Sequence, residues 1–370
     1  MRKGPGQPAR ASARGSTAER KQAHLELCLE EDVGALTRTT LLEDVELVHD
    51  ALPDLAESEI DTGVRWLGRR LRLPLLITGM TGGTAAAARI NRDLATLASE
   101  VGIAFGVGSQ RAMDEEPDLA WSFDVRAEAP DLLLLANIGI AQARTLPVAR
   151  VARLVERIRA DALCVHLNVA QELVQPEGDR DFRGGTAAIS RLVRALDVPL
   201  VVKETGCGLS RSVAERLREA GVRQVDVAGA GGTSWVRVEG LRAPESAGVA
   251  TVLRDWGIPT AASVLAVRAA GLRCVASGGI RSGLDVARAL ALGASMAGIA
   301  LPVYQRYRAA GRAGARAQIL EFERELRTVM LLTASRKIGD LPRAPRLIGP
   351  RLDAWRRFFQ GGRADRTTPR

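Results

Sequence analysis

The sequence predicts an α/β protein with a TIM (β/α)8 barrel, an N-terminal lid segment and a C-terminal helical extension. Three observations indicate this fold. Eight short, almost continuously apolar runs recur from residue 73 onward, helix-like segments separate them, and run-to-run spacing is mostly about 20–40 residues. Such runs are typical of strands buried on both faces of a parallel sheet, and the spacing is that of a βα unit. Eight units without a second sheet favour a barrel.

The predicted strands follow one another at this spacing and occupy 73–80, 102–108, 132–139, 162–168, 199–206, 224–232, 274–279 and 295–301. The clearest helical segments between them are 91–101, 148–159, 186–196, 212–220 and 284–292. The stretch 233–273 is longer and has room for an added loop and a second helix. A doubly wound Rossmann sheet is the alternative. It needs a Gly-x-Gly-x-x-Gly turn after the first strand, which Gly79-Met-Thr-Gly-Gly83 does not provide.

The composition is that of an ordinary globular chain of 370 residues, 46% hydrophobic and 26% charged, with no apolar run long enough to span a bilayer. The net charge of +9 lies at the ends, since 1–22 carry +5, 343–370 carry +6 and 23–342 carry −2. We interpret the ends as solubilising tails and expect no nucleic-acid partner, because nucleic-acid-binding domains place their charge on a folded face. The predicted organisation is a disordered tail over 1–18, a domain over 19–342 (N-terminal segment 19–72, barrel 73–310) and an Arg-rich extension over 343–370.

Cysteine usage indicates a reducing compartment. Cys28, Cys164, Cys207 and Cys274 have no Cys-x-x-Cys spacing, so reduced thiols are expected rather than disulfides or a zinc site. The basic first twenty residues lack the apolar core of a secretory signal, so a cytoplasmic protein is expected. Cys207 as a nucleophile is an alternative, but no histidine is near it in sequence and a packing role is favoured.

Polar residues gather at the expected carboxyl ends of the strands, where barrel chemistry takes place. Gly278 and Gly279 precede a helix, where exposed backbone N–H groups bind anions. We therefore favour a phosphate-binding site over the alternative, a tight turn that merely needs glycine. Lys203, one of only four lysines among 52 basic residues, lies in an apolar run. A lysine there could bind an anionic ring system or act as a general base. An ion pair with Glu204 is the alternative, weakened because strand neighbours point to opposite faces.

Two further positions carry candidate chemistry. His166 lies at the end of an apolar strand and shares a face with Asn168, which favours a functional role over a core histidine. Glu172 follows the same strand and could hold a divalent cation through a diphosphate. Because the sequence has no cluster of metal ligands there, the metal would be a hard cation such as Mg²⁺, shared with the substrate.

Taken together and in their order along the chain, the sequence motifs closely resemble those of the type 2 isopentenyl-diphosphate isomerases, a flavin-dependent family. The resemblance runs from about residue 19 to 341. It is carried by Arg20-Lys-x-x-His24, Met80-Thr-Gly-Gly83, Gly108-Ser-Gln-Arg111, Asn137-x-Gly139, His166-Leu-Asn168, Gln171-Glu172, Gln175-Pro-Glu-Gly-Asp-Arg-Asp-Phe182, Lys203-Glu-x-Gly-Cys-Gly208, Asp226-Val-Ala-Gly-Ala-Gly-Gly-Thr-Ser-Trp235 and Ser277-Gly-Gly-Ile-Arg281.

The resemblance implies an enzyme of isoprenoid biosynthesis that interconverts isopentenyl and dimethylallyl diphosphate by a 1,3-allylic proton shift. It implies FMN in reduced form as the acid and base, NADPH to keep it reduced, and Mg²⁺ to bind the diphosphate. It also implies a small-molecule substrate, no membrane partner, and a homo-tetramer or homo-octamer. The protein would supply positioning and electrostatics.

The resemblance also assigns roles to individual residues. FMN would contact Gly79, Met80, Thr81, Ser109, Asn137, Lys203 and Thr233, with its phosphate on Gly279, Ile280, Arg281, Ala300 and Leu301. The substrate would be held by Arg20, Lys21, Ser109, Gln110, Arg111, His166, Asn168 and Gln171, and Mg²⁺ by Glu172. Gln171, Lys203 and His166 would be catalytic. Because Arg20 and Lys21 precede the barrel, we expect a lid that orders when substrate binds.

Two other functions remain open. A hydroxy-acid oxidase on the same barrel would need a histidine base near the later strands, and no histidine follows His166. The second is a non-catalytic barrel that binds FMN or phosphate and acts as a scaffold through its basic tails. The intact set of Gln171, Glu172, Lys203 and His166 argues against it.

Overall fold

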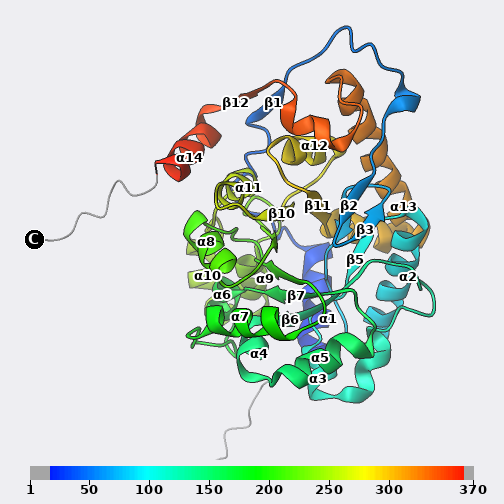
Figure 1. Ribbon diagram of the computed structural model, residues 1–370. Coiled ribbons are helices and arrows are strands. Elements are labelled where there is room, and N and C mark those ends of the chain that lie inside the picture. The colour runs from blue at the N-terminus through cyan, green and yellow to red at the C-terminus, as the bar shows by residue number, and fades with distance from the viewer. Residues whose placement is uncertain (1–16, 362–370) are drawn as a thin grey trace, which may run out of the picture.

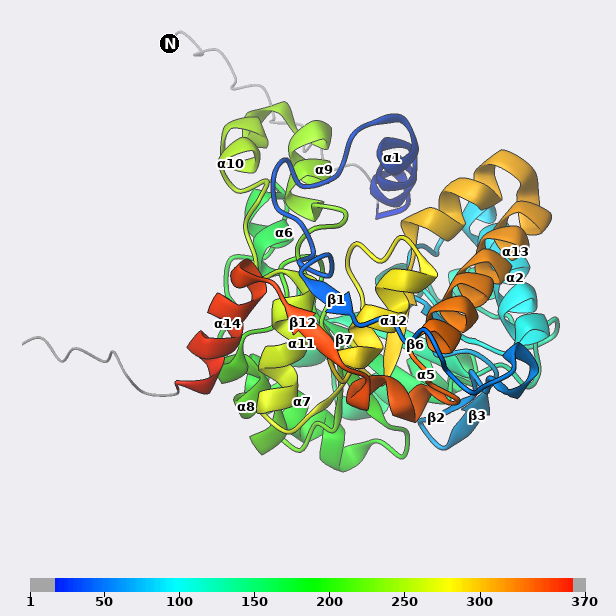
Figure 2. The same cartoon turned by 90° about the horizontal axis from the view of Figure 1, so that it is seen from above.

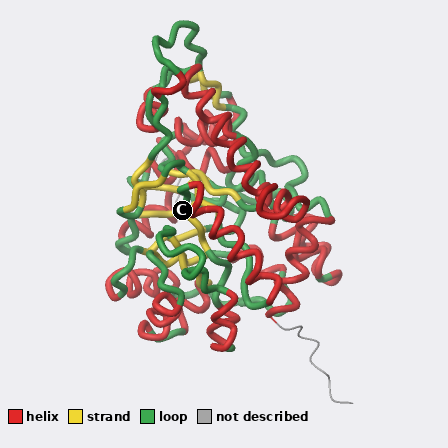
Figure 3. The backbone as a smooth tube through the Cα atoms, turned by 90° about the vertical axis from the view of Figure 1, so that its right-hand side faces the viewer, coloured by secondary structure: helices red, strands yellow, loops and turns green. Residues whose placement is uncertain are grey.

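The structure, a computed structural model, describes residues 17–361. Eight parallel strands close into a barrel in the order β10-β11-β4-β5-β6-β7-β8-β9, surrounded by helices (Figures 1 and 3). The strands are β4 (Leu75–Ile77), β5 (Ala104–Gly106), β6 (Leu134–Gly139), β7 (Ala162–His166), β8 (Leu200–Lys203), β9 (Gln224–Asp226), β10 (Arg273–Ala276) and β11 (Met296–Ile299). All eight predicted strands are confirmed, each shorter than its apolar run, and β10 begins at Arg273, one residue before its predicted start. The closed barrel excludes the open Rossmann sheet.

The helices between the strands confirm the βα period. They are α2 (Ala85–Val101), α3 (Arg111–Glu115), α4 (Ile140–Thr145), α5 (Val148–Arg157), α6 (Val169–Val174), α7 (Gly185–Ala195), α8 (Arg211–Glu219) and α12 (Gly283–Ala291). The long stretch after β9 holds α9 (Trp235–Arg242), α10 (Ala247–Val252) and α11 (Thr260–Ala269), so the predicted insertion is present. Short 3-10 helices lie at Glu57–Glu59, Pro117–Ser122, Pro244–Ser246 and Ile338–Arg343.

Alternation along the strands sorts their apolar side chains into two clusters. Leu75 and Ile77 of β4 pack outward against the helices, whereas Leu76 points into the lumen with Leu135 and Met296. A residue period of two produces this division in any strand. Both faces are therefore apolar, which explains why the sequence showed near-continuous hydrophobic runs.

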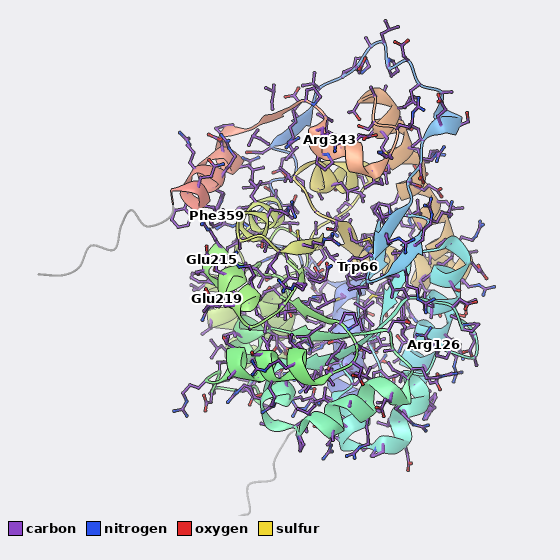
Figure 4. The ribbon with its side chains drawn as sticks, viewed as in Figure 1. Trp66, Arg126, Glu215, Glu219, Arg343 and Phe359 are labelled. Atoms are coloured by element: carbon purple, nitrogen blue, oxygen red, sulfur yellow. The ribbon has the colours of Figure 1, made fainter. Side chains whose placement is uncertain are left out.

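A hairpin closes the amino-terminal end of the barrel. Its strands β2 (Val64–Trp66) and β3 (Arg69–Leu71) pair in an antiparallel manner. Trp66 is 2% exposed, belongs to the lumen cluster, and donates its indole N–H to Gln224 at 3.3 Å (Figure 4). This end is therefore filled by side chains, and an open chamber is left only at the carboxyl ends of the strands.

The N-terminal helix α1 (Thr17–Glu30) contacts both α3 and α9, which follow strands on different sides of the barrel. It therefore lies over the mouth formed by the carboxyl ends of the strands, close to α9 in the view from above (Figure 2). The predicted disordered tail over 1–18 lies outside the described residues, except that α1 begins at Thr17.

The predicted C-terminal helical extension is present and is folded through residue 361, so our interpretation of its charge as that of a solubilising tail is wrong for 343–361. Strand β12 (Arg346–Ile348) pairs with β1 (Val45–Leu47), and α14 (Pro350–Gln360) packs against α11 (Figure 1). Phe359 is 4% exposed, stacks on Trp355 at 5.6 Å, and accepts a hydrogen bond from Arg211 of α8 through its carbonyl (Figure 4). Apolar contacts therefore fix this charged segment.

The preceding helix α13 (Leu301–Leu332) joins the barrel to this extension. Its backbone is non-helical at Ala310 and Gly311, where the expected barrel boundary falls. All four cysteines are free, and Cys207 is partly buried with its pKa raised to about 12 by burial, as a packing role requires. Among the described residues, no helix has the length and hydrophobicity needed to cross a bilayer.

Candidate active site

Two adjoining chambers open at the carboxyl ends of the barrel strands. The first has about 870 Å³ of empty space and the second about 980 Å³, both including solvent at the open mouth. They share one wall, made of His24, Gly79, Met80, Lys203, Thr205 and Trp235. Molecules bound in the two chambers would therefore lie next to each other.

The outer end of the first chamber is a cradle of backbone N–H groups. Gly278 and Gly279 have φ values of +95° and +75°, and Ala300 caps the N-terminus of α13. Within residues 17–361, the N–H groups of Gly279, Ile280 and Ala300 have no hydrogen-bond acceptor in the protein. Unpaired N–H groups beside a helix N-terminus bind anions, which suits the phosphate of FMN.

Arg281 contributes differently from its neighbours. Its backbone N–H donates to the Asp285 carboxylate at 3.0 Å, so this group is not open to a phosphate. Arg281 lines the chamber, and its guanidinium donates to the Ile280 carbonyl at 3.4 Å. The first turn of α12 is also occupied, because Gly283 donates to Glu325 and Asp285 donates to Ser282. The anion cradle is therefore built by the 278–280 turn and α13 rather than by α12.

Lys203 lies at the inner end of the first chamber. Its Nζ donates to the carbonyl of Glu204 at 2.6 Å and faces both chambers. The Glu204 carboxylate points elsewhere and accepts the N–H groups of Thr205, Cys207 and Gly208. Burial raises the pKa of Glu204 to about 7. The predicted opposite orientation of the two neighbours is confirmed, and no 203–204 side-chain ion pair forms.

Three cations line the outer part of the second chamber: Arg20, Lys21 and Arg111. Lys21 is anchored by donating from Nζ to the carbonyl of Ser109 at 2.8 Å, which ties α1 to the barrel. Burial, helped by the charge of Arg20, lowers the pKa of Lys21 to about 7. A lysine in this state gains its proton readily when an anion arrives, as a diphosphate site requires.

His166 faces the second chamber in one defined tautomer. Asn137 donates its amide N–H to the Val107 carbonyl at 3.1 Å, so its Oδ1 points at His166 Nδ1, 2.9 Å away. The oxygen can only accept, and Nδ1 therefore carries the proton. Burial and the charges of Lys203 and Lys21 lower the pKa of His166 to about 3, which leaves a neutral ring with Nε2 as an acceptor.

Gln171 is held by a carboxylate that the sequence did not reveal. Its amide donates to Oε1 of Glu239 at 2.8 Å, and His24 Nε2 lies 3.0 Å from the same oxygen. Burial opposes ionisation of Glu239, but His24, Gln171 and Arg242 bring its pKa to about 2. Glu239 therefore stays ionised and holds Gln171 and His24 beside the second chamber.

Glu172 lines the second chamber opposite the cations. Its Oε1 accepts from the Asn168 amide at 2.8 Å and its Oε2 from the Asp179 N–H at 2.8 Å. Each carboxylate oxygen keeps a second lone pair for a cation. The described residues contain no group of three or more His, Cys, Asp or Glu able to hold a metal.

The structure brings most of the predicted site residues together. The first chamber is lined by Gly79, Met80, Lys203, Thr233, Gly279, Ile280, Arg281, Ala300 and Leu301. The second is lined by Arg20, Lys21, Ser109, Arg111, Asn137, His166, Asn168, Gln171 and Glu172. Ser109 and Asn137 were expected to contact FMN, but they line this chamber and not the first.

Gln110 and Thr81 are the exceptions. Gln110 is fully buried, donating to the Leu154 carbonyl and accepting from the Asn137 N–H, so its side chain supports the site from behind instead of contacting substrate. Thr81 is 1% exposed and lines neither chamber. Both belong to motifs whose neighbouring residues do line a chamber. Spacing in the sequence alone does not distinguish a lining residue from a buried one.

Several lining residues were quoted in motifs without a site role, namely His24, Gln175, Trp235 and Ser277. The scarcity of histidine and tryptophan was the available signal for His24 and Trp235. Glu239 gave no signal, because a glutamate followed by an arginine three residues on reads as an exposed helical pair.

The fold and the anion cradle define the class to which this chain belongs, the FMN-binding barrels. A family model for FMN-dependent dehydrogenase matches residues 141–347. A mandelate oxidase structure (19% identity, TM-score 0.60) covers 90% of this chain and 100% of its own. A lactate oxidase from Pediococcus acidilactici (15% identity, TM-score 0.66) covers 89% and 93%. At these identities the likeness is one of fold.

Closer relatives identify the family. Proteins named isopentenyl-diphosphate delta-isomerase are 51% identical in a Synechococcus species (79% of this chain, 85% of that protein) and 44% identical in Methanothrix thermoacetophila (90% and 93%). Another in Halobacterium salinarum is 46% identical (88% and 92%). The chain belongs to the type 2, FMN-dependent isopentenyl-diphosphate delta-isomerase family and is an isomerase.

Proposed function

We propose that this enzyme interconverts isopentenyl and dimethylallyl diphosphate in isoprenoid biosynthesis, with reduced FMN in the first chamber and the diphosphate in the second. The shared wall carries the proposal, because it brings a cofactor chamber with an anion cradle against a chamber lined by three cations. The reaction removes a proton from one carbon of the allylic unit and delivers one to another. Reduced FMN, when bound, would supply the acid and the base of that transfer.

The chain's own residues would hold the reacting groups in place. Lys203 would place its charge at the cofactor's inner edge, where negative charge on the reduced ring is stabilised. Gln171, oriented by Glu239, would fix the hydrocarbon part of the substrate near the shared wall. Trp235 and Met80 would provide an apolar surface against the same part and exclude water.

The diphosphate would be bound by Arg20, Lys21 and Arg111. Mg²⁺, supplied through Glu172, would neutralise the remaining phosphate charge. His166 is neutral before binding, and a nearby dianion would favour protonation at Nε2, so we expect proton uptake when substrate binds. NADPH would serve as the external reductant of FMN.

Helix α1 would act as a lid. It carries Arg20 and Lys21 over the mouth. Lys21 is held by the hydrogen bond to Ser109 and lies over the Phe123 ring, and Arg20 forms a 3.6 Å ion pair with Glu177. Substrate would replace or strengthen these contacts and close the chamber to water. Release of product would require the same helix to move.

Assembly into a homo-tetramer or homo-octamer is the quaternary state we propose. A groove on the outer surface exposes apolar side chains, with Val169 at 41%, Leu173 at 49%, Val252 at 82% and Trp256 at 63% exposure. Such a patch usually marks a protein interface. A second copy of the chain would cover these side chains.

An isomerase assay tests the proposal. Purified protein would be given isopentenyl diphosphate, FMN, Mg²⁺ and NADPH under anaerobic conditions, with an NADPH-free control. We expect dimethylallyl diphosphate to form only when the flavin is reduced. Bound yellow FMN without isomerisation would reject the proposed reaction while leaving the cofactor site in place. The oxidase alternative predicts hydroxy-acid-dependent flavin reduction, although the sequence has no histidine after His166 to act as base.

A further inference from the structure

Asp226, the last residue of β9, is a carboxylate buried beneath the first chamber, and the mechanism above gives it no role. It is 1% exposed and pairs in register with Lys203 on the neighbouring strand β8. Both residues line a small cavity in the barrel lumen, large enough for about one water molecule. Asp226 is thus a charged group facing the cation at the inner end of the cofactor chamber.

Only half of the Asp226 carboxylate is satisfied. Oδ1 accepts from the Ser277 hydroxyl at 2.5 Å and from the Ala228 N–H at 3.2 Å. Oδ2 is buried and has no hydrogen-bond partner in the described part of the chain. A buried polar atom without a partner is costly unless a nearby charge or a water compensates it.

Lys203 is the compensating charge. The carboxylate of Glu204 accepts three backbone N–H groups and forms no hydrogen bond with Lys203, although the charge of Lys203 lowers its pKa. Burial raises the pKa of Asp226, and Lys203, Ser277 and Ala228 offset part of that rise. The ionised form of Asp226 is matched by the ammonium across the cavity.

We propose that ionised Asp226 is the counter-charge of Lys203 and thereby a positioning residue that lowers the reduction potential of bound FMN. Reduction adds negative charge to the flavin, and Lys203 stabilises that charge. A carboxylate behind the lysine weakens the positive field, so the reduced form is stabilised less than Lys203 alone would allow. The inference rests on the FMN site proposed above and is independent of the substrate.

The test compares Asp226→Asn with the wild-type holoenzyme by spectrophotometric titration of bound FMN against a reference dye. We expect the reduced flavin to bind about tenfold more tightly relative to the oxidised flavin, which moves the two-electron potential up by about 30 mV. The matched control is Asp161→Asn, which removes the same charge at the opposite end of the barrel beside Arg126 (Figure 4). It should leave the potential unchanged. An unchanged potential in Asp226→Asn, or equal shifts in both variants, overturns the inference.

A thermodynamic cycle covers the case in which Asp226→Asn does not fold. Lys203→Met leaves Asp226 unpaired, and the double variant Lys203→Met, Asp226→Asn removes both charges. We expect the double variant to unfold at a higher temperature than Lys203→Met. A double variant that is no more stable overturns the pairing. If the wild-type protein binds no FMN, the proposed function is rejected. If it binds FMN but the reduction potentials of the wild type and Asp226→Asn are equal, only this inference is rejected.

Discussion

His166 and Asn137 form a hydrogen bond of 2.9 Å between Nδ1 and Oδ1, and this contact fixes the chemistry of the histidine. The amide cannot rotate, because its nitrogen is held by the Val107 carbonyl. The ring is therefore neutral, with its acceptor nitrogen toward the diphosphate chamber. The stability and binding properties of the free enzyme follow in part from this arrangement.

His166 should make the protein sensitive to mild acid. Its pKa is about 3 in the folded protein and near 6.5 when unfolded, so between these values the unfolded state binds the extra proton. Stability is therefore lost as pH falls from about 6.5 toward 3. We expect the free energy of unfolding of the wild type to fall by about 1 kcal/mol more than that of His166→Gln between pH 6.5 and 5.5. Denaturant unfolding at both values measures this, and parallel losses would contradict the neutral ring.

Lys21 should impose a pH dependence on anion binding. Because its pKa is about 7 in the free enzyme, the charged form that holds a diphosphate is lost as pH rises through 7. We expect affinity for inorganic pyrophosphate to fall with a step near pH 7 that is absent in Lys21→Arg, whose guanidinium stays charged. Calorimetry from pH 6 to 9 measures both proteins. The same step in Lys21→Arg would assign it to another group.

Gln171 and Glu239 should affect turnover and spare the cofactor. Gln171→Ala removes the amide that lines the second chamber, and Glu239→Ala removes the carboxylate that accepts its hydrogen bond. We expect kcat to fall by about a hundredfold or more in each, with smaller effects in KM, because orientation matters most in the transition state. FMN affinity and its absorption spectrum should match the wild type. A purely structural role would lower FMN content and thermal stability together with kcat.

Gly279 should be essential for binding FMN. A methyl group at this position would lie 2.4 Å from Thr40 Cγ2, and the residue already has φ +75°. Gly279→Ala should therefore distort the anion cradle and weaken FMN binding by about a hundredfold, measured by flavin fluorescence. Gly68→Ala is the control, since Gly68 also has positive φ but has nothing within 4 Å of the added carbon. Equal losses in both variants would point to folding rather than phosphate binding.

The apolar groove should govern assembly. A charge at Trp256, as in Trp256→Glu, cannot be buried between copies without a large penalty. We expect this variant to give a smaller species in analytical ultracentrifugation than the wild type. Trp121→Glu, which alters a tryptophan that is 44% exposed outside the groove, should leave the mass unchanged. A wild type that sediments as a monomer would refute the proposed assembly.

The sequence alone determined the barrel, the positions of its eight strands and most of the lining residues. Strands buried on both faces leave a continuous apolar signal, and barrel chemistry falls where each strand ends, so these features are local. The two-residue period of a strand also predicted that the side chains of Lys203 and Glu204 point to opposite faces. Glycines before a helix indicated the anion cradle without reference to any other protein.

Only the tertiary structure decided what depends on contacts between distant segments. The roles of Glu239 and Asp226 arise because α9 and β9 meet Gln171 and Lys203 from other parts of the chain, and neither carboxylate differs in sequence from a surface acid. The inward turn of Gln110 depends on Leu154, 44 residues away. The charge of the C-terminal segment suggested a tail. The contact of Phe359 with α8 and the pairing of β12 with β1 show that the segment is folded. Side-chain burial and pKa are properties of the assembled surroundings, and no local pattern encodes them.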